Sequence, residues 1–294
     1  MTTANPPEPT DASAKVAVIT GASSGIGLVM AKTLARQGWR VIGLGRDLGR
    51  SKVAQAAIRG VSTGPGVAMV MADLAVMAEA ARAAREVATL TTWVDVLINN
   101  AGGTPAGRRE TPDGLEATFA ANHLGPFLLT TRLLPLLRAA APGARIVNVA
   151  SVAHRFAPAL DWDDLQARRK FSANTVYARS KLANILFTRE LARRLAGDGI
   201  RVNAMQPGMV ASNFASHGTG FMKLIYALGR PFSRTPEQGA DTALWLATAP
   251  EAASLTGGYF GDRKPAQAST EALNDESARR LWAESEALIA RSGA

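Results

Sequence analysis

The feature that most constrains the fold of this chain is a regular alternation of short apolar runs with longer helical segments. The apolar runs hold many β-branched residues, and the segments between them are rich in Ala, Leu and Arg. Such alternation is typical of βαβ units, whose parallel strands form a sheet covered by helices on both faces. We therefore predict an α/β fold with a seven-stranded parallel sheet. The runs are VAVIT (16–20), RVIGLG (40–45), VAMVMA (67–72), VDVLINN (94–100), RIVNVA (145–150), IRVNAM (200–205) and TGGYF (256–260).

Composition limits the classes of function. The chain has 294 residues, of which 47% are hydrophobic, and no linker divides it, so we predict one domain over residues 15–294. The absence of Cys excludes disulfides and a thiol nucleophile, and the three His residues lack metal-ligand spacing, so no metal site is expected. The net charge of +9 comes from scattered Arg residues rather than a basic stripe, which argues against nucleic acid as a partner.

The N-terminal residues 1–14 are polar and Pro-rich, and they contain no apolar core of a signal peptide. We predict a disordered tail here. No apolar run in the sequence reaches membrane-spanning length, so no integral membrane segment is expected. Together with the lack of Cys, these features are compatible with a cytoplasmic location, which is the expected one.

One long connection interrupts the alternation. Residues 209–235 follow the sixth run, where a strand-to-helix loop is normally short. We predict a substrate lid here, because a long loop in a compact domain usually has a function and an apolar lid suits a lipophilic substrate. Packing on the core, against another subunit or on a membrane surface are the alternatives. A helix is predicted to begin after Thr235, with Pro236 in first position and Gln238 closing a capping box.

A glycine-rich turn joins the first run to the first helix. Gly21, Gly25 and Gly27 let the backbone approach a pyrophosphate, whose charge is favoured at a helix N-terminus. After the second run, Gly45 stands where an acidic residue binds the ribose 2′-hydroxyl of NAD, and Arg46 follows it. A guanidinium can pair with a 2′-phosphate, so NADP(H) is the predicted cofactor. The alternative is that Arg46 is a solvated loop charge.

The stretch NTVYARSKLANIL (174–186) places Tyr177 and Lys181 four residues apart, on one face of a predicted helix. An ammonium beside a phenol favours the phenolate, which makes a tyrosine usable as an acid or base near neutral pH. Taken alone, the pair is equally typical of an ordinary amphipathic helix surface.

The motifs TGxxxGIG, NNAG (99–102), Ser151 after the fifth run, YxxSK and Pro207-Gly208 occur in this order. With them the chain resembles the classical short-chain dehydrogenases/reductases over residues 15 to 291, and so implies a Rossmann fold. The stretches NHLGPFLLT, DWDDLQ and YARSKLANILFTRELARRL resemble the retinol-dehydrogenase-like branch of that family.

This resemblance implies roles for individual residues. Tyr177 becomes the general acid/base, Lys181 lowers its pKa and holds the nicotinamide ribose, Ser151 contacts the substrate oxygen, and Asn122 holds a water that links Lys181 to solvent. Ser180 receives no chemical role, and His123 is expected to pack. For His154, near the pocket mouth, a structural or solvent-facing role is expected over a contact with substrate. The implied cofactor contacts are Gly21, Ser23, Ser24, Gly25, Ile26, Gly27, Arg46, Asp73, Leu74, Asn100, Ala101, Gly102, Tyr177, Lys181, Pro207, Gly208, Val210 and Ser212.

The expected function is therefore NADP(H)-dependent interconversion of a lipophilic alcohol and its ketone or aldehyde. The alternative from another class is a catalytically silent NADP(H)-binding regulator on the same fold. The family often pairs through helices at about 112–140 and 174–197, and both a homodimer and a homotetramer stay open. Substrate identity and physiological direction are not readable from the sequence.

Overall fold

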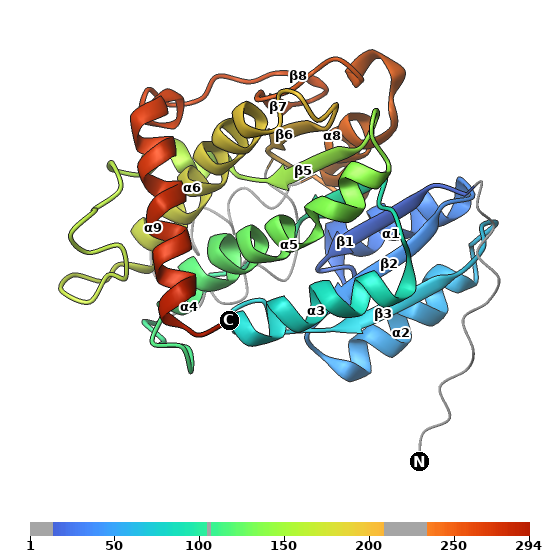
Figure 1. Cartoon of the computed structure of the whole chain (residues 1–294), viewed down its shortest axis with the longest axis horizontal. Helices are drawn as coiled ribbons and strands as arrows, with labels where there is room; N and C mark the ends of the chain where they lie inside the picture. The colour runs from blue at the N-terminus through green and yellow to red at the C-terminus, as the bar shows by residue number, and fades with distance from the viewer. Residues whose placement is uncertain (1–13, 105–106, 209–233) are drawn as a thin grey trace.

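A computed structural model describes residues 14–104, 107–208 and 234–294. The sheet has the order β3-β2-β1-β4-β5-β6-β7-β8, and all neighbours from β3 to β7 are parallel (Figure 1). The order reverses between β1 and β4, which in open α/β sheets marks the crevice where ligands bind. The strands are β1 (Val16–Thr20), β2 (Arg40–Gly45), β3 (Val67–Met71), β4 (Val96–Asn99), β5 (Arg145–Val149), β6 (Arg201–Met205), β7 (Tyr259–Gly261) and β8 (Lys264–Pro265).

The α/β fold is confirmed, but the prediction of seven strands was wrong by one. Strand β8 pairs antiparallel with β7, with Phe260 opposite Pro265. The chain reverses at Asp262 and Arg263, whose φ angles are 53° and 57°. Positive φ at two successive residues is the requirement of a tight hairpin turn, and glycine or asparagine usually signals it. Asp262 tolerates this conformation, but Arg263 stands where Gly usually follows, so the turn was not predicted.

Helices cover the sheet in two layers (Figure 1). Along β1, Val16 and Val18 pack into one core while Ala17 and Ile19 pack into the other, as expected for a strand buried on both faces. One layer holds α1 (Gly25–Arg36), α2 (Leu48–Arg59) and α8 (Pro236–Thr248), and the other holds α3 (Met77–Leu90), α5 (Gly125–Ala139) and α6 (Ala173–Arg194).

The described residues also contain several shorter helices. They are α4 (Ala117–Phe119), a π-helix (Ala120–Leu124) and 3₁₀ turns at Val152–Phe156, Pro250–Ala252 and Glu271–Leu273. The predicted capping box of α8 is confirmed, because Thr235 Oγ1 accepts from Gln238 N (3.3 Å) and Gln238 Oε1 accepts from Thr235 N (3.0 Å). The predicted tail up to residue 13 and the lid residues 209–233 lie outside the described residues.

The C-terminal helix α9 (Asp275–Arg291) packs on the outside of α6 (Figure 1). Its Trp282 ring lies 4.7 Å from the Phe127 ring of α5 and 5.9 Å from the Phe187 ring of α6, centroid to centroid. The Arg194 guanidinium lies 4.1 Å from the Trp282 ring, within reach of a cation–π interaction. Helix α9 therefore covers part of the surface through which pairing of two chains was expected.

Trp282→Ala should lower the free energy of unfolding by about 3–5 kcal/mol, the usual cost of truncating a buried Trp or Phe, because it empties the space between α5, α6 and α9. Urea denaturation followed by circular dichroism measures this loss. Trp162→Ala is the control, since Trp162 is only half-buried and stacks under Arg280. A loss at Trp282 no larger than at Trp162 would show that α9 is loosely held.

Candidate active site

Most of the predicted cofactor-binding residues, and Ser151, follow the carboxyl ends of strands, so the fold brings them to one edge of the sheet. The glycine turn follows β1, Arg46 follows β2, Asp73 and Leu74 follow β3, and Ser151 follows β5. Pro207 and Gly208 follow β6, whereas Val210 and Ser212 lie outside the described residues.

The glycine turn has the geometry of a phosphate cradle. Gly21 and Gly25 have φ angles of 70° and 54°, which other residues rarely adopt. A Cβ added to Gly27 would lie 2.2 Å from the Gly21 carbonyl oxygen, so the helix could not approach the turn with a larger residue. A Cβ added to Gly25 would meet nothing within 4 Å, so the outer side of the turn is open.

The N-terminus of α1 points its free backbone N–H groups at this open side. Among the described residues the Ser24 side chain makes no capping hydrogen bond, and the first turn of α1 holds no acidic residue. Unsatisfied N–H groups and the positive end of the helix dipole together favour an anion. The residues present therefore fit a pyrophosphate.

Position 45, the last residue of β2, has no room for a side chain. A Cβ on Gly45 would lie 2.4 Å from Ser51 Oγ and 3.3 Å from Ser23 Cβ. Ser51 is buried, so it cannot easily move aside. Arg46 is exposed beside this closed position, and no partner holds its guanidinium among the described residues.

Two predicted cofactor contacts after β3 are engaged locally. Asp73 Oδ1 accepts from Ala75 N (3.0 Å), and Asp73 N donates to Glu79 Oε2 (2.8 Å). Leu74 is buried, and its carbonyl packs so closely on α5 that a Cβ on Gly125 would lie 2.0 Å from it. These contacts fix the backbone of the turn in place.

Hydrogen bonds at the reversal point join the ends of β1 and β4. Thr20 Oγ1 accepts from both Asn100 N and Ala101 N (2.9 Å each), and Asn100 Nδ2 donates to the Thr20 carbonyl (2.9 Å). The Asn100 side chain thus secures the loop, and its predicted contact with the ribose stays a prediction. Gly102, next in the loop, lies between two predicted catalytic side chains, because its added Cβ would be 2.9 Å from Asn122 Oδ1 and 3.5 Å from Lys181 Nζ.

Tyr177 and Lys181 lie on one face of α6, as predicted. The Lys181 ammonium nitrogen is 5.7 Å from the centroid of the Tyr177 ring. Lys181 is buried, and Nζ donates to the Val149 carbonyl at the end of β5 (3.0 Å). Burial lowers the pKa of Lys181 to about 8, so the ammonium is still the main form at neutral pH.

Ser151 caps the 3₁₀ turn after β5, and its Oγ accepts from Ala153 N (3.1 Å). Its carbonyl accepts from His154 Nδ1 (2.7 Å), while His154 Nε2 accepts from Ser269 N (3.1 Å). The imidazole is therefore neutral with its proton on Nδ1, and burial lowers its pKa accordingly. The expected structural role of His154 is confirmed: it ties the Ser151 loop to the C-terminal segment.

The contacts of two residues at this edge were not predicted from the sequence. Ser180 Oγ accepts from Asn122 Nδ2 (2.9 Å), although the two are 58 positions apart and no local pattern signals the contact. Tyr259 donates its phenol to Gln206 Oε1 (3.1 Å) and packs edge-on against His154. Burial raises the pKa of Tyr259 and outweighs the opposing effect of Arg155, so this second tyrosine stays a protonated donor.

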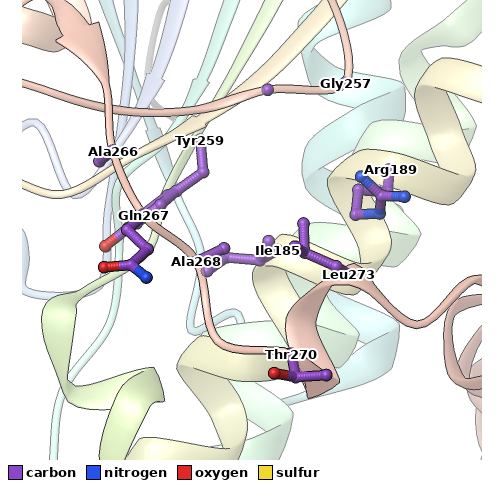
Figure 2. Close-up of a pocket in the computed structure, with 10 residues that line it drawn as sticks. Ile185, Arg189, Gly257, Tyr259, Ala266, Gln267, Ala268, Thr270 and Leu273 are labelled. Carbon is purple, nitrogen blue, oxygen red and sulfur yellow. The ribbon is translucent and has the colours of Figure 1, made fainter.

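A cavity of about 450 Å³ lies between α6, β7 and the segment 266–273 (Figure 2). Ile185 and Arg189 of α6 face Ala268 and Leu273 across it. None of the four predicted catalytic residues lines this cavity. We therefore do not assign the substrate position beside Tyr177 to this cavity.

Comparison with known proteins decides the family. The profile of the short chain dehydrogenase family matches residues 15–219. This chain belongs to the short-chain dehydrogenase/reductase family. It is an oxidoreductase of the alcohol–carbonyl class that uses a nicotinamide cofactor, and its likeness to the retinol-dehydrogenase branch is confirmed.

Retinol dehydrogenase 14 of Homo sapiens is 39% identical to this chain over 292 residues, and the match covers 94% of this chain and 86% of that protein. The crystal structure of an uncharacterized protein from Mycobacterium Paratuberculosis is 32% identical, with a TM-score of 0.75, covering 94% of this chain and 93% of that one. An active-site complex of Pseudomonas aeruginosa RhlG with NADP is 30% identical, with a TM-score of 0.66, covering 84% and 93%.

The described residues form neither a metal-binding cluster nor a membrane-spanning helix. Within them, no three His, Asp or Glu side chains gather closely enough to hold a metal ion. No helix in the same ranges combines the length and apolarity that crossing a bilayer requires.

His123, next to Asn122 in the π-helix, is buried among Phe119, Phe127 and Phe187. Ser285 Oγ on α9 donates to the Leu281 carbonyl (2.7 Å), so it accepts from His123 Nε2 (2.9 Å). Burial lowers the pKa of His123 to about 3, which keeps the ring neutral. The expected packing role of His123 is confirmed, and its ring also hydrogen-bonds to α9.

His123→Phe should make the protein less sensitive to acid. The unfolded chain protonates His123 near pH 6.5, while the folded chain keeps it neutral until about pH 3, so stability falls as the pH drops below 6.5. Between pH 7 and 4.5 this one group should cost about 2–3 kcal/mol, at roughly 1.4 kcal/mol per pKa unit. Urea denaturation of both proteins at the two pH values measures the difference. Equal losses in wild type and variant would contradict the buried neutral ring.

Proposed function

We propose that this chain is an NADP(H)-dependent oxidoreductase that interconverts a lipophilic alcohol and its ketone or aldehyde, with Tyr177 as the general acid/base. The observation that carries the proposal is the buried Lys181 ammonium 5.7 Å from the Tyr177 ring, at the strand ends that also hold the glycine cradle. Residues 15–294 would act as one cofactor-binding domain.

Tyr177 is preferred over Tyr259 as the proton carrier for an electrostatic reason. The Lys181 cation beside Tyr177 favours its phenolate, whereas the Tyr259 phenol is buried and its pKa is raised. A general acid/base needs a pKa near the working pH. Tyr177 has a buried cation beside it, whereas at Tyr259 the effect of burial on the pKa outweighs the opposing effect of Arg155.

Ser151 would orient the substrate oxygen. Its Oγ uses a lone pair to accept from Ala153 N, which leaves the hydroxyl proton for the substrate. In the reducing direction, Ser151 would donate a hydrogen bond to the carbonyl oxygen while Tyr177 gives it a proton. In the oxidising direction, Tyr177 would take the proton from the alcohol.

The cofactor, when bound, supplies or accepts the hydride. The cradle of Gly21, Gly25 and Gly27 would hold its pyrophosphate at the N-terminus of α1. Lys181 would reach the nicotinamide ribose, for which its remaining ammonium protons are suited.

NADP(H) is preferred over NAD(H) because of the loop after β2. A carboxylate at position 45 would have to displace Ser51, whose Oγ would lie 2.4 Å from the new Cβ. The neighbouring Arg46 is exposed and can pair with a 2′-phosphate through two hydrogen bonds.

An apolar substrate is supported by two observations. The human relative is named for retinol. In this chain, Val152 and Phe156 are the first and last residues of the 3₁₀ turn that Ser151 caps, and 42% and 81% of their surface is exposed. Large exposed apolar side chains beside a reactive group suit an apolar ligand.

Tyr177→Phe should retain cofactor binding and lose turnover by about two to four orders of magnitude, because the ring still packs but no proton can be transferred. Initial rates on a panel of lipophilic ketones and aldehydes, with fluorescence titration of NADPH, measure both. Tyr259→Phe is the matched control: it removes the phenol that contacts Gln206 and should keep most of the activity. Wild-type rates in Tyr177→Phe would refute the mechanism.

Arg46→Ala should weaken NADPH by about tenfold to a hundredfold and NADH far less, because a partly exposed charge-assisted pair contributes about 1.5–3 kcal/mol. Gly45→Asp together with Arg46→Ala and Ser51→Ala should reverse the preference, since the last change makes room for the carboxylate. The measurement is kcat/KM for both cofactors at low and high salt, and the wild-type preference should shrink as salt rises.

Arg50→Ala is the control for the cofactor test, because Arg50 is another exposed cation at the same end of α2 and contacts Asp47. The ratio of the two kcat/KM values should change much less in this variant. A wild type that prefers NADH, or an unchanged ratio in Arg46→Ala, would contradict the assignment of Arg46.

A further inference from the structure

Ser180 lies on α6 between Tyr177 and Lys181, and none of its surface is exposed. Its hydroxyl donates to the Tyr177 carbonyl (2.7 Å). A hydroxyl has one proton, so toward its other neighbour Ser180 must act as an acceptor. That neighbour is the side-chain amide of Asn122, whose Nδ2 lies 2.9 Å from Ser180 Oγ.

The Asn122 amide is held on all sides. Oδ1 accepts from Gly103 N (2.8 Å), and Nδ2 donates both to the Gly103 carbonyl (3.0 Å) and to Ser180 Oγ. A flipped amide would set its oxygen against the Gly103 carbonyl and against a Ser180 hydroxyl whose proton is already engaged. Ser180 and Gly103 therefore permit only one orientation.

In this orientation, Asn122 Oδ1 lies on the side of the site that holds Lys181. Gly102 separates Asn122 Oδ1 from Lys181 Nζ, and an added Cβ there would lie 2.9 Å from the first and 3.5 Å from the second. Asn122 Oδ1 and Lys181 Nζ thus flank the same glycine.

We propose that Ser180 is a positioning residue for proton transfer: it fixes the Asn122 amide in its working orientation and ties it to the turn of α6 that carries Tyr177. This inference rests on the proposed function, in which Asn122, Tyr177 and Lys181 form the proton path. Ser180 itself touches neither substrate nor cofactor.

Thr188 provides a matched control on the same helix. It is also fully buried, donates to a carbonyl of its own helix (Asn184, 2.7 Å) and accepts from a buried asparagine amide (Asn148 Nδ2, 2.9 Å). Thr188→Val and Ser180→Ala each delete one hydroxyl with the same bonding pattern, but only Ser180 bonds to Asn122.

The first test compares turnover in the two variants. Ser180→Ala should lower kcat by about tenfold or more, change KM less than about threefold and shift the pH profile of kcat, because a buried amide proton loses its acceptor and Asn122 loses its tie to α6. Thr188→Val should lower the melting temperature by a similar amount and leave kcat and its pH profile near wild type. If both variants lose stability and neither loses kcat, the inference is overturned.

The second test is a double-mutant cycle with Asn122→Ala. If Ser180 acts through Asn122, adding Ser180→Ala to Asn122→Ala should change kcat less than about twofold, since coupled residues are not additive. Multiplying effects would overturn the inference. Ser180→Cys keeps a weak acceptor of similar size, so it should recover part of the kcat lost in Ser180→Ala, and it serves if the alanine variant folds poorly.

A third readout needs no turnover. In the cofactor-free protein, the Asn122 side-chain amide gives an NMR signal that is assigned by its loss in Asn122→Ala. Its protons should exchange with water at least tenfold faster in Ser180→Ala than in Thr188→Val, and equal exchange rates would overturn the inference. Activity in Tyr177→Phe would refute the proposed function instead, whatever the Asn122 signal does.

Discussion

The organisation of the site depends on one buried cation. Lys181 is 4% exposed, and the hydrogen bond from Nζ to the Val149 carbonyl fastens α6 to the end of β5. Removing an ammonium from water is costly unless acceptors replace the water, and the lowered pKa of Lys181 reflects that cost. The hydrogen bond to Val149 uses one of its three protons. Under the proposed function, the other two serve the cofactor ribose and the Tyr177 phenolate.

Polar contacts near this cation extend to the C-terminal helix. Asn122 is fixed by Gly103 and Ser180, while the next residue, His123, donates to Ser285 on the C-terminal helix. The π-helix Ala120–Leu124 presents two adjacent side chains to opposite partners, one toward the strand ends and one toward α9. Extra turns of this kind inside helices are frequent at functional sites because they redirect side chains.

Most of the fold could be predicted because its strands are buried on both faces. In such strands most residues are apolar, so β1, β2, β4, β5 and β6 were visible as runs, and the residues after them could be assigned to one edge. The eighth strand was missed because Asp262 and Arg263 adopt positive φ without a glycine. The hydroxyl of Ser180 and the steric block of Ser51 were missed for another reason: each depends on a tertiary contact, with Asn122 or Gly45, that no local pattern encodes.

The crowding at Gly45 also bears on how this family diversifies. A carboxylate at that position meets Ser51 Oγ, so the substitution is strained until helix α2 has first lost the hydroxyl. Ser51 Oγ is buried and has no hydrogen-bond partner among the described residues, so its loss carries little penalty of its own. The order of the two substitutions is therefore constrained. The Ser51 hydroxyl must be lost first, because only then can position 45 accept a carboxylate without a clash. The last position of β2 looks freely variable in the sequence, but in this chain the Ser51 side chain near the start of α2 limits which residues fit there.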